Sequence, residues 1–293
     1  MSIRTDLAIE LKDTISSNLH GIISDTLQLD YNTNITRVKV VNEIGSRTIG
    51  KEIGDYVTIE NEDLFFYKDY VAKIIKNELC NMLPKNECRT LIVGLGNRFI
   101  TPDALGCETV KNTLVTRHIK EQIDFDLGDV SAITPGVLGI TGIESSDIVL
   151  AVTKVVKPDV VIIIDALASR SVSKIGKTIQ ITNTGIAPGS GIGNKRNALN
   201  KETLNCEVIA IGVPTVVYSS TIVHDMIETI VSSGNGDSEV IQPLVNGVFY
   251  ENNMVVTPKE IDEIIKKCSK VVADGINMAL HNIDKETIDS LLD

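Results

Sequence analysis

Two aspartates follow short apolar segments of the kind that form buried strands. Asp165 comes directly after the run Val160–Ile164, and Asp103 follows the run that ends at Gly94. Open α/β sheets bind their ligands at the carboxyl ends of parallel strands, so both carboxyl groups are expected at one sheet edge. Of two adjacent carboxyl groups, one keeps its proton while the other is ionised and acts as a base. We therefore take Asp103 and Asp165 as a candidate catalytic pair that activates water for amide hydrolysis.

Each aspartate also has an ordinary structural role open to it. In Thr101-Pro-Asp103 the threonine suits a helix N-cap, Pro102 the first helical position, and Asp103 the positive end of the helix dipole. Asp165 suits the N-cap of a helix that begins near Ala166. The sequence has no Asp-Thr-Gly motif of the known aspartic proteases, so both roles remain open at this point.

Several polar residues nearby are candidates for contact with a substrate. The segment 183–196 holds four glycines followed by Lys195 and Arg196, so it is either a mobile surface loop or a loop whose N–H groups and cations face an anionic group. His118, at the end of the helix expected after Asp103, either reaches the site or bonds last-turn carbonyls. The candidate substrate-binding or supporting residues are Asn97, Thr101, His118, Gly189, Ser190, Gly191, Lys195 and Arg196.

Other chemistries find less support. A dinucleotide fingerprint that starts at Gly94 would need a third glycine where Phe99 stands, and Gly176-Lys-Thr178 lacks the first glycine of a phosphate loop because position 171 is serine. There is no HExxH or GxSxG motif, which argues against zinc peptidases and serine hydrolases. We predict neither a cofactor nor a bound metal.

The elements that must position these residues form an α/β pattern. Short β-branched runs at 90–94, 160–164 and 208–212 are separated by helix-length stretches, which indicates a parallel sheet covered on both faces. Residues 35–60 predict strands of a small meander, and 63–82, 220–233 and 257–281 predict helices. We expect one domain over 1–293, a three-layer sandwich with a mostly parallel central sheet and a small β meander near the N-terminus. Residues 232–253 are predicted to form a surface excursion.

Composition narrows the class of protein. The chain of 293 residues has a formal net charge of −11, only 4% aromatic residues and no tryptophan. Direct binding of nucleic acid is therefore not expected. Five cysteines without a CxxC motif indicate a reducing compartment. No apolar stretch is long enough for a membrane span, and the first residues lack the apolar core of a signal peptide. We therefore predict a cytoplasmic location and no membrane partner.

Longer motifs resemble those of a known family, the germination protease of spore-forming bacteria. The resemblance runs in order along nearly the whole chain. It rests on Arg4-Thr-Asp-Leu-Ala8, Gly94-Leu-Gly-Asn97, Thr101-Pro-Asp-Ala-Leu-Gly106, Pro135 to Asp147, Asp165-Ala-Leu-Ala-Ser-Arg170, Pro188-Gly-Ser-Gly-Ile-Gly-Asn-Lys-Arg196, Val256 to Glu260 and Asn277 to His281.

The resemblance implies an endopeptidase that degrades small acid-soluble spore proteins in the spore core during germination. It implies a homotetramer made as a zymogen that removes its own short N-terminal segment. The implied fold is phosphorylase/hydrolase-like, as in hydrogenase maturation endopeptidases, and the family's proposed catalytic pair carries over to Asp103 and Asp165. A mean hydropathy of +0.12 despite 23% charged residues also favours subunit contacts.

Two features depart from the family pattern, and other functions stay open. The Arg-Thr-Asp-Leu-Ala motif begins at Arg4, so we expect little or no pro-segment before it, and 232–253 looks shorter than its equivalent. One alternative is a metal-assisted peptidase with Asp103, Asp165 and His118 as ligands. The other is a non-catalytic binder of spore proteins or nucleotides. Incubation with a small acid-soluble protein, with and without a chelator, separates these.

Overall fold

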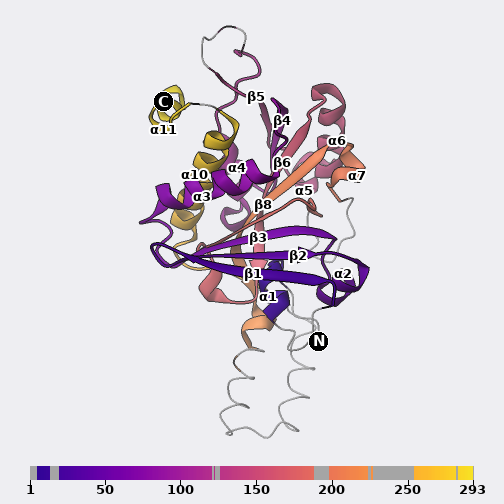
Figure 1. Cartoon of the computed structure of the whole chain (residues 1–293), viewed down its shortest axis with the longest axis vertical. Coiled ribbons are helices and arrows are strands. Elements are labelled where there is room, and N and C mark those ends of the chain that lie inside the picture. Colours follow the sequence, from indigo (N-terminus) through magenta and orange to yellow (C-terminus); the bar gives the residue numbers. More distant parts are fainter. Residues whose placement is uncertain are drawn as a thin grey trace, which may run out of the picture.

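One large mixed sheet organises the molecule (Figure 1). The computed structural model describes residues 5–13, 20–120, 122, 126–187, 198–223, 226, 254–281 and 283–292. Within these ranges the sheet has nine strands in the order β1-β2-β3-β7-β8-β6-β4-β5, and β9 pairs with β8. The strands are β1 (Ile22–Leu29), β2 (Thr33–Val40), β3 (Gly54–Asn61), β4 (Arg89–Gly94), β5 (Asp129–Ile133), β6 (Val160–Ser169), β7 (Thr178–Thr182), β8 (Glu207–Tyr218) and β9 (Val255–Val256).

The parallel part of the sheet consists of β5, β4, β6 and β8. The three apolar runs of the sequence are its strands β4, β6 and β8, as expected. Residues 160–164 are fully buried, because alternate side chains of β6 enter the cores on the two faces of the sheet. A strand that is covered on both faces reads as a continuous apolar run rather than an alternating one.

The meander near the N-terminus is not a separate small unit. Strand β3 pairs antiparallel with β7, and β7 pairs antiparallel with β8, so β1–β3 extend the same sheet. The expectation of a mostly parallel sheet was therefore wrong, and the sheet is mixed. The junction is held by Ile59, Ile179 and Ile181, which are fully buried in one core. In Figure 1 the indigo strands run across the view while β4 and β6 run up it, so the sheet is strongly twisted.

Helices pack on both faces of the parallel part. On one face the core includes residues of α3, α4 and α10, among them Leu79, Leu105 and Val272. On the other face it includes Val149 of α6 and Leu204 of α7. The described helices are α1 (Ala8–Asp13), α2 (Glu43–Ile49), α3 (Lys68–Met82), α4 (Leu105–Lys111), α5 (Leu138–Thr141), α6 (Ser145–Val156), α7 (Lys201–Leu204), α10 (Ile261–Leu280) and α11 (Lys285–Leu292), with 3₁₀ turns η1 (Thr101–Asp103) and η2 (Val172–Lys174).

Strand β6 is longer than the sequence indicates. A helix that begins near Ala166 was one of two possibilities, but the strand continues to Ser169 because these residues keep pairing with β8, with one irregularity after Leu167. Asp165 is therefore a strand residue and not a helix N-cap. The excursion expected at 232–253 lies outside the described residues, as does most of the helix expected at 220–233.

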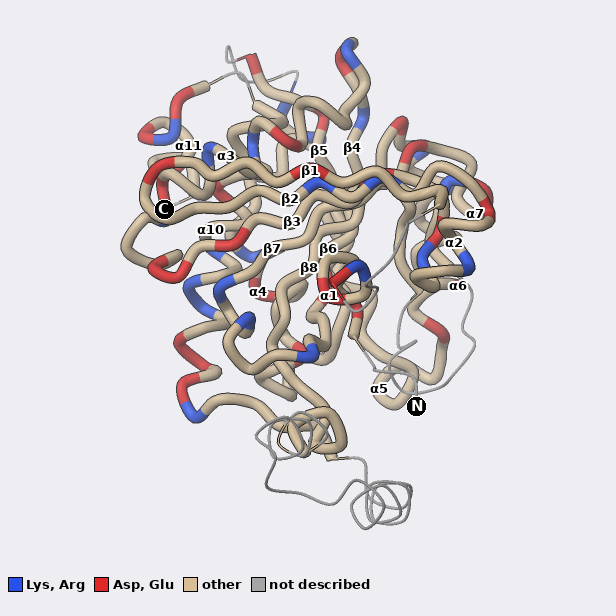
Figure 2. Tube along the Cα trace, turned by 60° about the horizontal axis from the view of Figure 1, so that its bottom comes forward, with Lys and Arg blue, Asp and Glu red and all other residues tan. Residues whose placement is uncertain are grey.

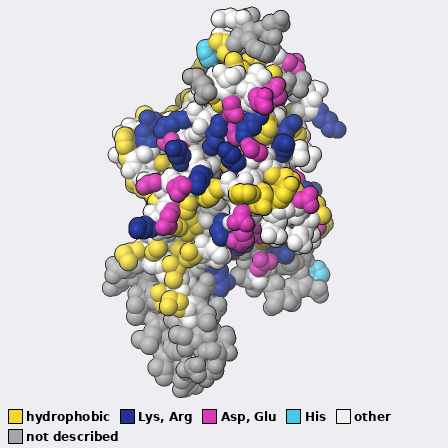
Figure 3. Space-filling view, turned by 90° about the vertical axis from the view of Figure 1, so that its left-hand side faces the viewer, with side chains coloured by type: hydrophobic (Ala, Val, Ile, Leu, Met, Phe, Trp, Pro, Cys, Tyr) yellow, Lys and Arg dark blue, Asp and Glu magenta, His cyan; other side chains and the backbone are white. Residues whose placement is uncertain are grey.

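Charged side chains are spread over the surface. The coloured trace in Figure 2 shows acidic and basic residues alternating along the helices and loops. The face in Figure 3 shows Lys and Arg intermixed with Asp and Glu, with apolar side chains between them. Among the described residues, no helix combines the length and the apolar character that a membrane crossing requires.

Candidate active site

The pairing of β4 with β6 brings Asp103 and Asp165 to the same edge of the sheet. Gly94 lies opposite Ile164 in the parallel register, and the amide of Leu95 donates to the carbonyl of Ile164 over 2.9 Å. Asp165 is the next residue of β6. On the neighbouring strand the chain leaves β4 at this level and turns into η1, which ends in Asp103. Both residues therefore lie at the carboxyl edge of the sheet, where the sequence predicted them.

A tight turn at Gly96 folds the loop back onto Asp103. Gly96 has a φ of +102°, and a Cβ on it would lie 1.9 Å from the carbonyl oxygen of Asp103. The amide of Asn97 donates to Oδ2 of Asp103 over 2.8 Å, and the side chain of Asn97 accepts from the amide of Phe99 over 3.0 Å. Only glycine allows this close approach of two backbone segments. Asn97 therefore supports Asp103 through its backbone and the loop through its side chain.

The helix start expected at Thr101 takes another form. Thr101, Pro102 and Asp103 form the 3₁₀ turn η1, and the carbonyl of Thr101 accepts from the amide of Ala104 over 3.0 Å. No side chain caps either η1 or α4. The carboxyl group of Asp103 thus faces the loop after β4 rather than capping the helix that follows.

The two carboxyl groups differ in their electrostatic surroundings. Burial raises the pKa of Asp103, and the hydrogen bond from Asn97 opposes this. Burial raises the pKa of Asp165 far above its ordinary value, the nearby charge of Asp103 raises it further, and the amide of Ala166 opposes both. These surroundings favour the protonated form more strongly at Asp165 than at Asp103.

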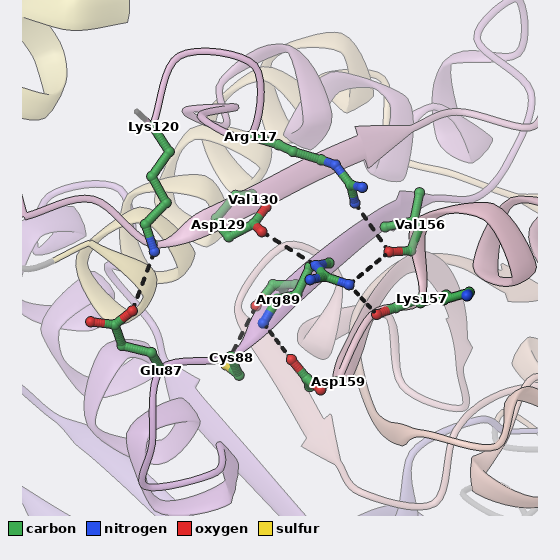
Figure 4. Close-up of polar contacts among 12 residues, drawn as sticks. Glu87, Cys88, Arg89, Arg117, Lys120, Asp129, Val130, Val156, Lys157 and Asp159 are labelled. Atoms are coloured by element: carbon green, nitrogen blue, oxygen red, sulfur yellow. Dashed lines mark hydrogen bonds and ion pairs between the residues drawn. The ribbon is translucent and has the colours of Figure 1, made fainter. Parts of the chain in front are cut away.

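His118 does not join them. It is exposed in the turn that follows Thr116, and the amides of Thr116 and Arg117 both donate to the carbonyl of Val130 at the start of β5. Figure 4 shows its chain neighbour Arg117 pointing to the carbonyl of Val156, beside Arg89 at the start of β4. This is the amino edge of the sheet, opposite the aspartates. The expectation that His118 reaches the site was wrong, because the segment after α4 crosses the sheet before β5 begins.

The glycine-rich loop lies mostly outside the described residues. The candidates outside the described residues are Gly189, Ser190, Gly191, Lys195 and Arg196. Its two ends are joined by an antiparallel bridge between Ile186 and Leu199, with N–O distances of 3.0 and 2.7 Å. Ile186 also packs with Leu7 and Leu167, so the base of the loop lies beside the second half of β6.

Asp6 in the N-terminal segment was not among the predicted site residues but lies close to the pair. Asp6 donates its amide to the carbonyl of Ala168 over 2.9 Å, and its Oδ2 accepts from the amide of Ala168 over 2.8 Å. Its charge is one of those that raise the pKa of Asp165. The signal in the sequence was the Arg4-Thr-Asp motif, which carried the family resemblance without indicating a position in the fold.

The described part of the chain shows no group of three or more His, Cys, Asp or Glu side chains that could hold a metal ion. Asp103 and Asp165 alone offer two carboxyl groups. That is fewer than the three or four protein ligands of a zinc site. That the site works without a metal ion stays a prediction.

Comparisons with known proteins agree with the sequence motifs. A profile of the germination protease family matches residues 4–240 and 234–291. The germination protease of Caldanaerobacter subterraneus subsp. tengcongensis is 44% identical over 96% of this chain and 94% of its own length, and that of Clostridium tetani is 39% identical over the full length of both. A crystal structure of the hydrogenase maturation protease HycI from Thermococcus kodakarensis aligns with 69% of this chain and 98% of its own, with a TM-score of 0.40 and 18% identity. The match to the family profile and the identity to these relatives show that the chain belongs to the germination protease family.

Proposed function

We propose that this protease is an endopeptidase that cleaves small acid-soluble spore proteins during germination, with water activated by Asp103 and Asp165. Family membership provides the protease role in spore germination. One observation carries the assignment of the site. Two half-buried carboxyl groups lie at the carboxyl edge of β4 and β6, and the charge of one raises the pKa of the other. A proton-donating acid and an ionised base in one place are what amide hydrolysis requires.

The surroundings divide the work between the two residues. Asp103, whose ionised form is stabilised by the Asn97 amide, takes a proton from water as the water oxygen attacks the peptide carbonyl carbon. Asp165 gives its proton to the carbonyl oxygen, and a tetrahedral intermediate forms. When the C–N bond breaks, Asp103 returns its proton to the leaving nitrogen. Asp165 regains a proton from the hydroxyl group as the carboxylic acid product forms, so both residues end as they began.

Apolar side chains beside the pair offer a surface for the substrate chain. Phe99 is 77% exposed and Ile100 is 53% exposed on the loop after β4, and Ile140 is 52% exposed in α5 after β5. The two segments meet where Arg98 Nη2 donates to Thr134 Oγ1 over 3.2 Å. We propose that this surface binds an apolar side chain of the substrate. The loop residues Gly189, Ser190, Gly191, Lys195 and Arg196 stay proposed contacts for its polar groups.

The test compares two active-site variants with a control at the residue that precedes β6. Asp103→Asn and Asp165→Asn keep the volume and a hydrogen-bonding oxygen but remove the acid–base group, so each is expected to abolish cleavage of a purified small acid-soluble spore protein. Asp159→Asn is the matched control, because Asp159 lies at the amino edge of the sheet, where its carboxyl group accepts from the Arg89 amide (Figure 4). The Asn side chain keeps an oxygen that can accept the same hydrogen bond.

The readout is the disappearance of substrate on a gel, together with thermal unfolding of each variant. Near-normal turnover in either active-site variant would refute the assignment. Loss of cooperative folding in both would show that the aspartates are structural. Cleavage is expected to continue in the presence of a chelator, and its loss would favour the metal-assisted alternative with the same carboxyl groups.

Assembly and location are further parts of the proposal. We propose a homotetramer in the spore core that is made as a zymogen, in line with the resemblance of the sequence motifs. The strand β1 supports subunit contacts, because Ile23 is 61% and Leu27 is 47% exposed on an edge strand of the sheet. Light scattering at micromolar concentration measures the mass, and a monomer there would contradict the tetramer.

A further inference from the structure

The second half of β6 has a different neighbour from the first half. Up to Ile164 the strand pairs with β4, but β4 ends at Gly94 and the chain turns away to Asp103. Beyond that level the described N-terminal segment takes the place of β4, with Asp6 bonded to both backbone groups of Ala168. Asp165 stands at the change from one neighbour to the other. Its position therefore depends on how firmly each neighbour is held.

The N-terminal segment is fixed to β6 through a second acid as well. The carboxyl group of Glu10 accepts from the amides of Arg170 and Ser171 over 2.7 and 3.0 Å and from the hydroxyl of Thr5. Glu10 is 6% exposed. Asp6 and Glu10 together accept from three backbone amides at the end of β6, those of residues 168, 170 and 171. Acidic groups that accept backbone amides make strong, charge-assisted hydrogen bonds.

Asp6 is held from the other side by its own carbonyl group. That oxygen accepts from Nζ of Lys51 over 2.8 Å and from Nε2 of Gln180 over 3.2 Å. Gln180 also fixes the next turn of the segment, because its Oε1 accepts from the amide of Ala8 over 2.7 Å. Lys51 follows α2 and Gln180 lies in β7, so two further parts of the fold hold the segment against β6.

We propose that Asp6 is a positioning residue for the catalytic pair, which fixes the second half of β6 and supplies a negative charge beside Asp165. This inference rests on the proposed roles of Asp103 and Asp165. The charge of Asp6 opposes ionisation of Asp165 and so helps to keep it in the proton-donating form. Asp6 does not touch the substrate and takes no part in proton transfer.

In the described part of the chain, two acids act on the charge state of Asp165, and one amine faces Asp6. Among the described residues, the groups whose charge acts on Asp165 are Asp103 from the turn after β4 and Asp6 from the N-terminal segment, and both raise its pKa. Lys51 faces Asp6, and burial lowers the pKa of its amine while the charge of Asp6 opposes this. Arg170 follows at the end of β6. The carboxyl group of Asp6 is thus held in place by the amide of Ala168, and its main-chain carbonyl by Lys51.

The test separates the charge of Asp6 from its hydrogen bond. Asp6→Asn keeps an oxygen that accepts from Ala168 but removes the charge, whereas Asp6→Ala removes both. Glu10→Gln is the matched control, because it weakens the anchoring of the same strand end at a greater distance along the chain from Asp165. Each variant is measured for kcat and KM against pH with a purified small acid-soluble spore protein, and for thermal unfolding.

Asp165 must be protonated to act as the acid, so its ionisation sets the alkaline limb of the kcat profile. Removing a negative charge makes that ionisation easier, and the alkaline limb is expected to move to lower pH in Asp6→Asn with little change in unfolding temperature. Asp6→Ala is expected to show the same shift and a lower kcat. Glu10→Gln is expected to lower the unfolding temperature and leave the limb in place.

Each possible failure has its own signature. If the Asp6→Asn profile superimposes on that of the unchanged protein while Asp165→Asn is inactive, the role of Asp6 is refuted and the catalytic pair stands. If Glu10→Gln moves the limb as far as Asp6→Asn does, the effect comes from a loosened strand and not from the charge. If Asp165→Asn retains turnover, the proposed function itself fails.

Discussion

Substitution of Gly96 by alanine tests whether the turn before Asp103 sets the geometry of the site. The residue has a φ of +102°, where an L-amino acid pays about 1–2 kcal/mol in steric strain. The new Cβ would also lie 1.9 Å from the Asp103 carbonyl oxygen and 3.2 Å from its Oδ1, and the first is a backbone atom that cannot rotate away. Overpacking of this kind typically costs about 1–3 kcal/mol. The sum is about 2–5 kcal/mol, which most domains of ordinary stability survive.

The clash has to be relieved by moving η1, and Asp103 moves with it. A displacement of about 1 Å in a catalytic group lowers the rate by roughly 100-fold, so that loss of kcat is expected in the folded variant. Gly50→Ala is the matched control, because Gly50 has a φ of +64° and a Cβ on it would meet no other atom within 4 Å. It is expected to lose about 1–2 kcal/mol and keep its kcat.

The assay combines urea unfolding, read by circular dichroism, with cleavage of a small acid-soluble spore protein at a temperature where both variants are folded. The difference in free energy of unfolding between the two glycine variants isolates the clash at Gly96 from the strain common to both. The reasoning is refuted if Gly96→Ala matches Gly50→Ala in both stability and kcat.

Four further outcomes are expected. Because burial raises the pKa of Asp165 above its ordinary 3.8, the residue destabilises the fold once the pH exceeds 3.8. Asp165→Asn is therefore expected to unfold at a higher urea concentration than the unchanged protein at pH 7. This difference is expected to shrink toward pH 4. Burial lowers the pKa of His281 from 6.5, so its contribution to stability is complete above pH 6.5 and is lost as the pH falls below that value. In His281→Gln the urea midpoint of unfolding is therefore expected to change less between pH 7.5 and 5.5 than in the unchanged protein. Lys285→Met removes a 2.9 Å partner of Asp274, which is 3% exposed and keeps Lys270 at 3.3 Å, and is expected to cost about 1–3 kcal/mol in calorimetry. Phe99→Ala is expected to raise KM roughly 10-fold with unchanged kcat, equivalent to about 1.4 kcal/mol of apolar contact with the substrate.

The buried strands could be predicted because their residues have few alternatives. A run such as Val160–Ile164 is too short for a helix and too apolar for an exposed strand, so its position in a covered sheet follows from composition alone. The placement of Asp103 and Asp165 at one edge then follows from the parallel pairing of β4 and β6. Local chemistry and chain direction were sufficient for that part of the site.

What could not be predicted depends on contacts between distant segments. The extension of β6 to Ser169 reflects pairing with β8, and residues 165–169 alone have no pattern that favours a strand over a helix N-terminus. The position of His118 depends on where the chain crosses the sheet after α4. The position of Asp6 depends on its hydrogen bond with Ala168, and the sequence does not show which amide an acidic side chain accepts from.

The attachment of the N-terminal segment to β6 also sets an order in which the site can be assembled. Asp6 and Ala168 are 162 residues apart, and at ribosomal speeds of about 5–20 residues per second the first waits roughly 10–30 s for the second to be made. Contacts of such long range form late because the loop between them must be closed first. The described N-terminal residues therefore have no folded place to occupy until β6 and β7 have been synthesised. A nascent chain therefore cannot place the proposed catalytic pair in its final surroundings until more than half of it has been made.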